Sequence, residues 1–237
     1  RPARAVSASA VATHALDAPA ARRIASAFLP DFALGNRYDY YYVQGKLRSD
    51  PLYPGALAAL RGSTAPLLDL GCGLGLLAHA LRGDGQPMAY RGVDTDAAKI
   101  ARAARAARRA SLADATFEVV DLARTLPPHH GSVALLDVLQ YLDVEAQQRL
   151  LAGMSAMLTP EAAFVIRSPV ADDGGRSRTT RLFDRLAHRI GWMGMRPLHY
   201  PTLDALRTTL EAHGLHVDCT PLYGRTPFNN WLIVARR

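Results

Sequence analysis

Three alternating glycines follow a short apolar run in the segment PLLDLGCGLG, residues 66–75. Glycine is needed where a backbone must turn tightly and let a ligand come close, and Gly71, Gly73 and Gly75 precede an apolar-periodic, helix-like stretch. A nicotinamide-binding fingerprint would carry its third glycine where this chain has Leu76, so NADH is not expected to bind. Cys72 is expected to be a small packing residue and not a nucleophile. The segment predicts a strand, a ligand-binding turn and a helix.

Acidic residues stand at or near the ends of four expected strands. Asp69 precedes the first glycine by two residues, and Asp94 ends YRGVD at roughly the spacing that reaches a ribose hydroxyl pair. Asp121 ends FEVVDL, and Asp137 lies near the end of VALLDVLQYL. These positions indicate ligand contacts, while capping of helices and turns is the alternative for each acid, most of all for Asp137.

Strand and helix patterns alternate from residue 66 onward, which is typical of a parallel sheet. The expected strands are Pro66–Leu70, Ala89–Asp94, Thr116–Val120, Val133–Val138, Ala163–Arg167, Leu215–Leu222 and Trp231–Ala235. The expected helices of this part are Leu74–Arg82, Ala97–Arg109, Val144–Leu158 and Thr202–His213. The last two strands are joined by the short stretch YGRTPFNN, so we expect them to form an antiparallel hairpin.

The glycine turn and the ordered set of four acids resemble the class I S-adenosylmethionine-dependent methyltransferases, over residues 66–237. The closing segments LEAHGLHVD and NNWLIVARR are similar to the last helix and hairpin of that family. The resemblance implies an α/β fold with a doubly wound, mostly parallel seven-stranded sheet. Its strand order would be 3-2-1-4-5-7-6, with strand 7 antiparallel and helices on both faces.

The resemblance also implies S-adenosyl-L-methionine as the cofactor, bound by residues from four strand ends. In the family's pattern the methionine part is wrapped by Gly71, Cys72, Gly73 and Gly75, and its amino group is held by Asp69, directly or through water. The remaining contacts would be Asp94 with Thr95 at the ribose, Asp121 with Leu122 at the adenine, and Asp137 with Val138 beneath the sulfonium.

A general base for the acceptor must lie at the carboxyl edge of the sheet, where open parallel sheets bind ligands. Tyr141 follows the fourth strand, and His199 and Tyr200 precede the helix at residue 202; we name these three candidate catalytic residues the carboxyl-edge trio. Ordinary half-buried packing is the alternative for each of them. The histidine pair, His129 and His130, precedes the fourth strand and should lie at the opposite edge.

The N-terminal residues 1–60 are expected to form an arm and a helical cap, ahead of a methyltransferase domain at 61–237. Asp17 and Pro19 predict a helix that ends near Pro30, and the tyrosine-rich stretch 36–55 is expected to be irregular. Within it, Arg37 and Lys46 could pair with the cofactor carboxylate or simply lie on the surface. Tyr40, Tyr41 and Tyr42 could close over the methyl group or pack the cap. An insertion at about 170–200 would provide specificity or a homodimer contact.

The net charge of +7 raises the question of an anionic partner. The densest basic stretch has helical spacing, so a solvated helix face is the favoured explanation; its members are Lys99, Arg102, Arg105, Arg108 and Arg109. Two cysteines far apart predict neither a disulfide framework nor a metal site. The chain lacks a run of roughly 20 apolar residues and a signal-peptide block, so a cytoplasmic protein without a membrane span is expected.

The leading functional hypothesis is methyl transfer to a small molecule, at oxygen or carbon of an aromatic or polyketide-like acceptor. The fourth strand runs into VLQYLD and not into the Asn/Asp-Pro-Pro-aromatic turn of many nucleic-acid methylating enzymes, so nucleic acid is not the expected partner. The stretch RYDYYYVQGKLRSDPLY is also similar to methyltransferases of bacterial aryl-polyene pathways. The alternatives are an RNA methyltransferase and a non-catalytic partner protein that binds S-adenosylmethionine.

Overall fold

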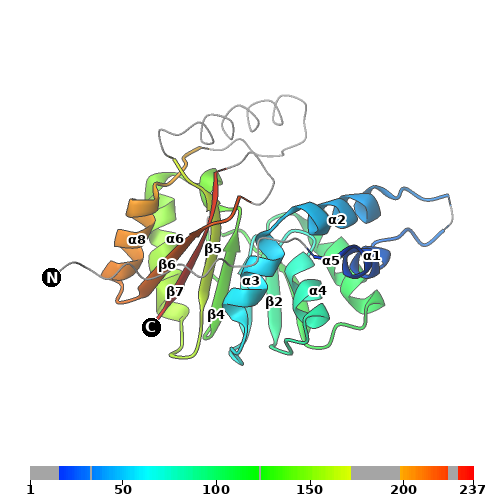
Figure 1. Ribbon diagram of the computed structural model, residues 1–237, viewed down its shortest axis with the longest axis horizontal. Coiled ribbons are helices and arrows are strands. Elements are labelled where there is room, and N and C mark those ends of the chain that lie inside the picture. Colours follow the sequence, from blue (N-terminus) through cyan, green and yellow to red (C-terminus); the bar gives the residue numbers. More distant parts are fainter. Residues whose placement is uncertain (1–15, 33, 123, 172–197, 224–228) are drawn as a thin grey trace.

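A single twisted sheet organises the computed structural model, which describes residues 16–32, 34–122, 124–171, 198–223 and 229–237 (Figure 1). The strand order is β3-β2-β1-β4-β5-β7-β6. β7 runs antiparallel to both of its neighbours, and the other described pairings are parallel. The strands are β1 (Leu67–Leu70), β2 (Tyr90–Asp94), β3 (Ala115–Val119), β4 (Ser132–Leu136), β5 (Phe164–Pro169), β6 (His216–Pro221) and β7 (Asn230–Arg236). The predicted fold class, strand order and reversed last strand are confirmed.

Helices cover both faces of the sheet, so its central strands are apolar on both sides (Figure 1). One layer contains α3 (Leu52–Leu60), α4 (Leu76–Gly83) and α5 (Ala97–Arg109), and the other contains α6 (Val144–Met157) and α8 (Leu203–Ala212). Neighbouring strand residues alternate between the two cores: Leu67 packs in the first and Leu68 in the second. This alternation directs Asp69, in β1, toward the layer of α3 and α4.

The N-terminal region is more helical than the sequence suggests. Its helices are α1 (Ala18–Ser26), which begins at the predicted cap Asp17, and α2 (Tyr38–Ser49), followed at once by α3. The prediction of an irregular cap over residues 36–55 is therefore wrong. Val43 and Leu47 are buried, while Tyr41 and Tyr42 are exposed. Because apolar residues such as tyrosine also lie on the solvent side of α2, the sequence pattern does not reveal its narrow buried face. Tertiary packing decides the conformation of this stretch.

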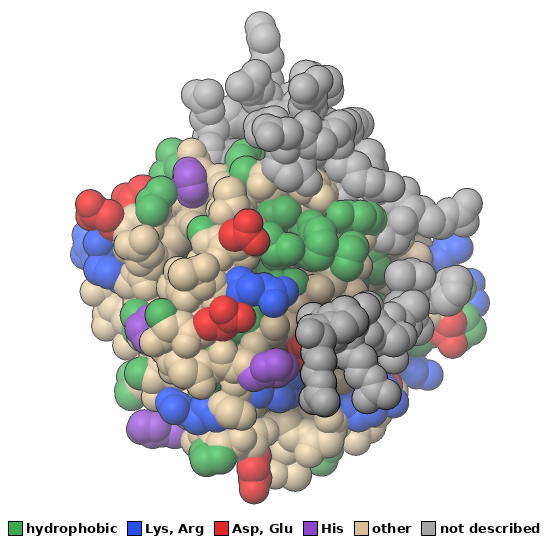
Figure 2. All heavy atoms as spheres, turned by 60° about the vertical axis from the view of Figure 1, so that its left-hand side comes forward, with side chains coloured by type: hydrophobic (Ala, Val, Ile, Leu, Met, Phe, Trp, Pro, Cys, Tyr) green, Lys and Arg blue, Asp and Glu red, His purple; other side chains and the backbone are tan. Residues whose placement is uncertain are grey.

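Two arginines of the basic stretch on α5 hold the N-terminal helices. Arg102 Nη1 lies 2.9 Å from Asp39 Oδ1 on α2, and Arg109 bonds to Asp31 and to the carbonyl of Leu29, just beyond α1. The solvated-face explanation is thus incomplete, because part of this charge is used inside the molecule. Where described residues are visible on the face that carries α8 and β6, basic and acidic side chains are interspersed and form no continuous basic surface (Figure 2).

Within the described ranges, no helix is both long enough and apolar enough to cross a membrane. The insertion expected at about 170–200 falls mostly outside these ranges, which stop at residue 171 and resume at 198. The boundary expected between residues 60 and 61 stays a prediction, although α1, α2 and α3 share one buried core with β1 and α4.

Candidate functional site

The glycine turn connects β1 to α4 at the carboxyl edge of the sheet. The φ angles of Gly71, Gly73 and Gly75 are +75°, +56° and +68°, a region that other residues rarely adopt. A Cβ on Gly71 would lie 2.4 Å from Cγ2 of Val138, so no side chain fits there. At Gly73, by contrast, an added Cβ would meet no atom within 4 Å. The turn therefore packs on the protein at one glycine and presents open backbone to a ligand at the next.

Asp94 fixes the shape of this turn. Gly73 N donates to Asp94 Oδ2 over 2.9 Å, and Asp96 N donates to Oδ1 over 2.9 Å. Asp94 thus caps the turn, which is the alternative to ligand contact given for it in the sequence analysis. Its side chain is half-buried at the end of β2, beside the exposed Thr95. Contact of Asp94 and Thr95 with a ribose stays a prediction.

Asp69 is a buried acid that caps nothing. It is 2% exposed, and the hydroxyl of Tyr90 on the neighbouring strand donates to its Oδ2 over 2.6 Å. Its Oδ1 is buried without a hydrogen-bond partner among the described residues. Burial raises the pKa of Asp69 to about 7, with the hydrogen bond from Tyr90 acting against it. Asp69 thus has one oxygen that could accept from a ligand; its contact with the amino group of S-adenosylmethionine stays a prediction.

Cys72, between the glycines, is half-buried, and burial raises the pKa of its thiol. A thiol that resists ionisation is a poor nucleophile, in agreement with the packing role expected for it.

Asp137 follows β4 and takes part in a network of charges. Its φ is +62°, an unusual value for a residue other than glycine. Nη1 of Arg167, on β5, lies 2.6 Å from Asp137 Oδ2 and 3.1 Å from Asp50 Oδ2. Asp50 also pairs with Lys46 Nζ at 3.1 Å. Arg167 is 5% exposed and Asp50 is 8% exposed, so the pairs at the centre of this network are shielded from water.

The sequence analysis missed Arg167 and Asp50. The available signal was an arginine inside the apolar run AAFVIRSP, since a charged residue in a buried strand requires a partner. Lys46, predicted as a partner of the cofactor carboxylate, belongs to this network, and its side chain is still 27% exposed. Arg37, the other predicted partner, is exposed at the start of α2.

The adenine side of the predicted site is the most open. Asp121 is exposed, stands two residues beyond the end of β3, and lies 3.3 Å from Nε of Arg124. Leu122 is partly buried against the α6 and α8 core. Contact of Asp121 and Leu122 with adenine stays a prediction.

The structure brings the carboxyl-edge trio to one corner of the sheet. The short 3-10 helix η1 (Leu139–Tyr141) follows β4, and the backbone N–H of Leu198 donates to the carbonyl of Gln140 over 2.8 Å. The amide of Gln147 then donates to His199 O over 3.1 Å and to Leu139 O over 2.8 Å. Tyr141 and Tyr200 are half-buried and His199 is exposed, so all three retain accessible surface; Gln147 was not predicted.

The histidine pair lies at the other edge, as the topology argument predicts. The ring Nε2 of His129 lies 2.9 Å from the carbonyl of Ser132, the first residue of β4. Ser132 is paired with Leu67, the first residue of β1, so this position marks the amino edge of the sheet.

The tyrosines of α2 serve different purposes. Tyr40 is partly buried against the core, as in the packing alternative, whereas Tyr41 and Tyr42 are 59% and 43% exposed. Tyr42 stacks on Tyr38, with 6.1 Å between the ring centroids. The two exposed side chains therefore stay candidates for contact with an acceptor.

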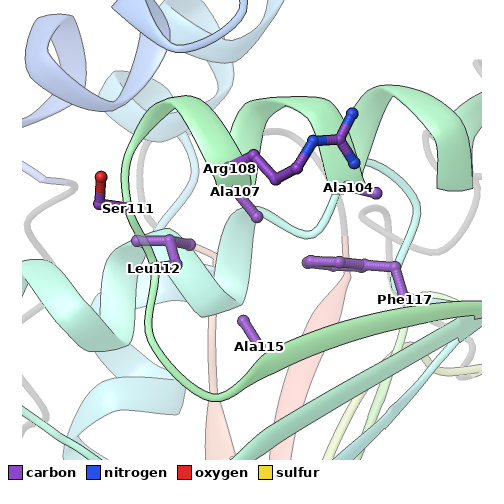
Figure 3. A pocket seen from close by; sticks show the side chains of 7 residues that line it. All are labelled: Ala104, Ala107, Arg108, Ser111, Leu112, Ala115 and Phe117. Carbon is purple, nitrogen blue, oxygen red and sulfur yellow. The ribbon is translucent and has the colours of Figure 1, made fainter.

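A separate hollow of about 170 Å³ lies between α5 and β3 (Figure 3). Phe117 from β3 and Arg108 from α5 are among the side chains that line it (Figure 3). β3 is the outer strand of the sheet, three positions from β4, so this hollow is distinct from the charge network around Asp137.

Comparison with known proteins agrees with this geometry. Residues 67–161 match the profile of a family described as a methyltransferase domain. No curated protein matches the chain.

Solved structures share the fold at low sequence identity. An O-methyltransferase family protein from Burkholderia thailandensis is 19% identical, with a TM-score of 0.60 over 77% of this chain and 55% of that protein. The magnesium protoporphyrin IX methyltransferase of Synechocystis PCC 6803, solved with bound SAH, is also 19% identical, with a TM-score of 0.60 over 92% and 94% of the two chains. The [4+2]-cyclase SpnF is 17% identical, with a TM-score of 0.60 over 92% and 91%. This chain thus spans little more than half the length of the Burkholderia protein.

Proposed function

We propose that this chain, whose residues 67–161 match a methyltransferase-domain family, is a class I S-adenosylmethionine-dependent methyltransferase that acts on a small molecule. The methyl group would go to an oxygen or carbon of an aromatic or polyketide-like acceptor. The observation that carries the proposal is the position of the charge network around Asp137, directly beside the glycine turn. Val138 touches Gly71, so an acceptor placed over Asp137 would lie next to the methionine end of the cofactor. Ligands of open parallel sheets bind where the strand order reverses, here between β1 and β4.

The cofactor supplies an activated methyl group, so the protein has to place the acceptor in line and exclude water. Asp69 would hold the amino group, the open backbone at Gly73 would lie against the methionine part, and Asp94 would reach the ribose. The orphaned oxygen of Asp69 and the empty space at Gly73 both support this placement.

The acceptor would enter between α2 and the corner of the carboxyl-edge trio. Tyr38 and Tyr42 offer an exposed stacked pair, a surface suited to a flat conjugated molecule. Within the trio, a tyrosine or histidine could take the proton from an acceptor hydroxyl. We expect the cap of residues 1–60 to form one side of this entrance and the insertion at about 170–200 to determine specificity. A homodimer stays a prediction.

Two solved structures with this fold are those of the mitomycin 7-O-methyltransferase MmcR and of the pyocyanin biosynthetic protein PhzM. They support an acceptor of this class for the present chain, and the choice between oxygen and carbon stays part of the proposal. The similarity to the cyclase SpnF makes a direct test of methyl transfer necessary.

The test is incubation of the protein with methyl-labelled S-adenosylmethionine and a cell extract separated into small-molecule, RNA and protein fractions. Label in the small-molecule fraction, lost in the Asp94→Ala variant, is the expected result. Salt-dependent label in RNA would favour the RNA methyltransferase alternative. Cofactor binding without label in any fraction would favour a non-catalytic partner protein.

A further inference from the structure

The two carboxylate oxygens of Asp69 are in different states. The Tyr90 hydroxyl donates to Oδ2 over 2.6 Å, whereas Oδ1 is buried and has no partner within the described residues. Leaving a buried acceptor unsatisfied costs free energy, and more when the group is charged. The fold tolerates this cost at the base of the cofactor turn, where a ligand can supply the missing donor.

None of the described groups that act directly on the carboxyl group of Asp69 is positively charged. Asp94 adds negative charge from the end of β2, and Tyr90 is the first residue of the same strand. Cys72 lies in the turn, and Tyr53 of α3 acts on Tyr90 from the helix layer that covers this face of the sheet. Burial raises the pKa of Asp69 to about 7, the hydrogen bond from Tyr90 lowers it, and Asp94 raises it. Near neutral pH this carboxyl group is therefore partly protonated.

Tyr90 is held firmly enough to orient Asp69. Its side chain is 2% exposed, and its ring packs against Phe117, with 5.7 Å between the centroids. The register pairs Tyr90 with Leu67 and Gly92 with Asp69, so the tyrosine reaches diagonally across the two strands. The donor is the hydroxyl at the end of the ring, so phenylalanine at residue 90 would bring no donor to this oxygen.

We propose that Tyr90 is a positioning residue of the cofactor site: it fixes one oxygen of Asp69, leaves the other for the amino group of the cofactor, and so couples cofactor binding to the release of a proton. The proposal rests on the proposed contact between Asp69 and that amino group. In the step itself, the carboxylic acid gives its proton to solvent, and the carboxylate that remains pairs with the ammonium group. Tyr90 acts through Asp69 and does not touch the cofactor.

The coupling has a defined direction. A ligand ammonium lowers the pKa of Asp69 on binding, so below about pH 7 binding releases close to one proton, and affinity rises about tenfold per pH unit. Above that pH little is released, and affinity levels off. In Tyr90→Phe the carboxylate loses its donor, so its pKa rises and the whole profile moves to higher pH. For a pKa increase of about one to two units, affinity at pH 7 falls about fivefold to fiftyfold.

The experiment is titration calorimetry of S-adenosylhomocysteine binding between pH 5.5 and 8.5, repeated in buffers of different ionisation enthalpy to count the protons released. Wild type should release close to one proton at the acid end and almost none at pH 8, whereas Tyr90→Phe should still release protons at pH 8. Asp69→Asn should release none at any pH in this range. Tyr223→Phe, the same chemical change at a tyrosine that contacts Trp231 just beyond β6, should behave as wild type.

The ligand 5′-methylthioadenosine provides a second control, because it lacks the amino-acid part of the cofactor. Its affinity should not follow the ionisation of Asp69. The inference would be overturned by equal proton release in wild type and Tyr90→Phe, or by the same pH profile for both ligands. Failure of wild type to bind either ligand would instead contradict the proposed function.

Discussion

Removal of the Arg167 side chain should strongly destabilise the fold. The guanidinium is 5% exposed and pairs with both Asp50 and Asp137, so Arg167→Met would leave two carboxylates without their main counter-charge. Breaking a buried charge pair from one side costs about 3–5 kcal/mol. For a chain of this size, that corresponds to a fall in melting temperature of about 6–20 °C.

The pH dependence of this loss distinguishes a charge effect from a packing effect. In wild type, burial opposes ionisation of Asp50, but Arg167 and Lys46 outweigh it and lower its pKa. In Arg167→Met that carboxyl group is left with burial and a weaker partner, so its folded pKa rises. A raised folded pKa means that stability is lost as pH increases, so the deficit of the variant should be larger at pH 8 than at pH 5.

Urea unfolding of wild type and variant at both pH values measures this, with the slope m checked for constancy. Arg149→Met is the matched control, because its partner Glu145 lies 3.6 Å away and both side chains are mostly exposed. That variant should stay within about 0.5 kcal/mol of wild type. A cost below about 1 kcal/mol for Arg167→Met, or a deficit independent of pH, would refute the buried network.

Three further results are expected. Gly73→Val and Asp94→Ala should each weaken S-adenosylhomocysteine binding about tenfold or more by calorimetry, since the first blocks the backbone approach and the second removes a charged acceptor. NADH should not bind wild type. Unchanged affinity in both folded variants would show that the cofactor site is misplaced. Replacing both members of the histidine pair by alanine should leave turnover within a few-fold of wild type. At least one of Tyr141→Phe, His199→Ala and Tyr200→Phe should lower turnover about a hundredfold. The reverse ranking would contradict the topology argument. His79 is 3% exposed, and burial lowers its pKa to about 4, so it favours the folded state only when neutral. The free energy of unfolding of wild type should therefore fall by about 2 kcal/mol between pH 7 and pH 5 because of this group. Urea unfolding of His79→Gln at both pH values should lack this part of the pH dependence.

Much of the cofactor side was predictable because its signals are local. Gly71, Gly73 and Gly75 adopt left-handed φ angles within five residues of each other, and glycine records such a requirement in the sequence itself. Asp94 holds Gly73 from the next strand, as in the turn-capping alternative given for it. The ribose contact that its spacing predicts stays a prediction. The prediction of an irregular stretch at residues 36–55 failed, and the solvated-face explanation of the basic stretch on α5 was incomplete. Both outcomes depend on which distant segment packs against these residues.

The buried polar pairs on both the acceptor side and the cofactor side depended on contacts that no spacing rule describes. Arg167 and Asp50 are separated by 117 positions, and Asp69 and Tyr90 by 21. Each of these polar groups is buried, so its partner is dictated by which strands and helices become neighbours and in which register.

The sequence by itself determined the alternation of strands and helices, the tight glycine turn and the acids at the strand ends, since these follow from backbone geometry and short-range periodicity. The tertiary structure alone decided that Tyr90 satisfies one oxygen of Asp69 and leaves the other free, and that Arg167 joins Asp137 to the N-terminal helices. The physical reason is that a buried polar group pays its desolvation cost wherever it lies, while the group that compensates it comes from whatever segment the fold brings within about 3 Å.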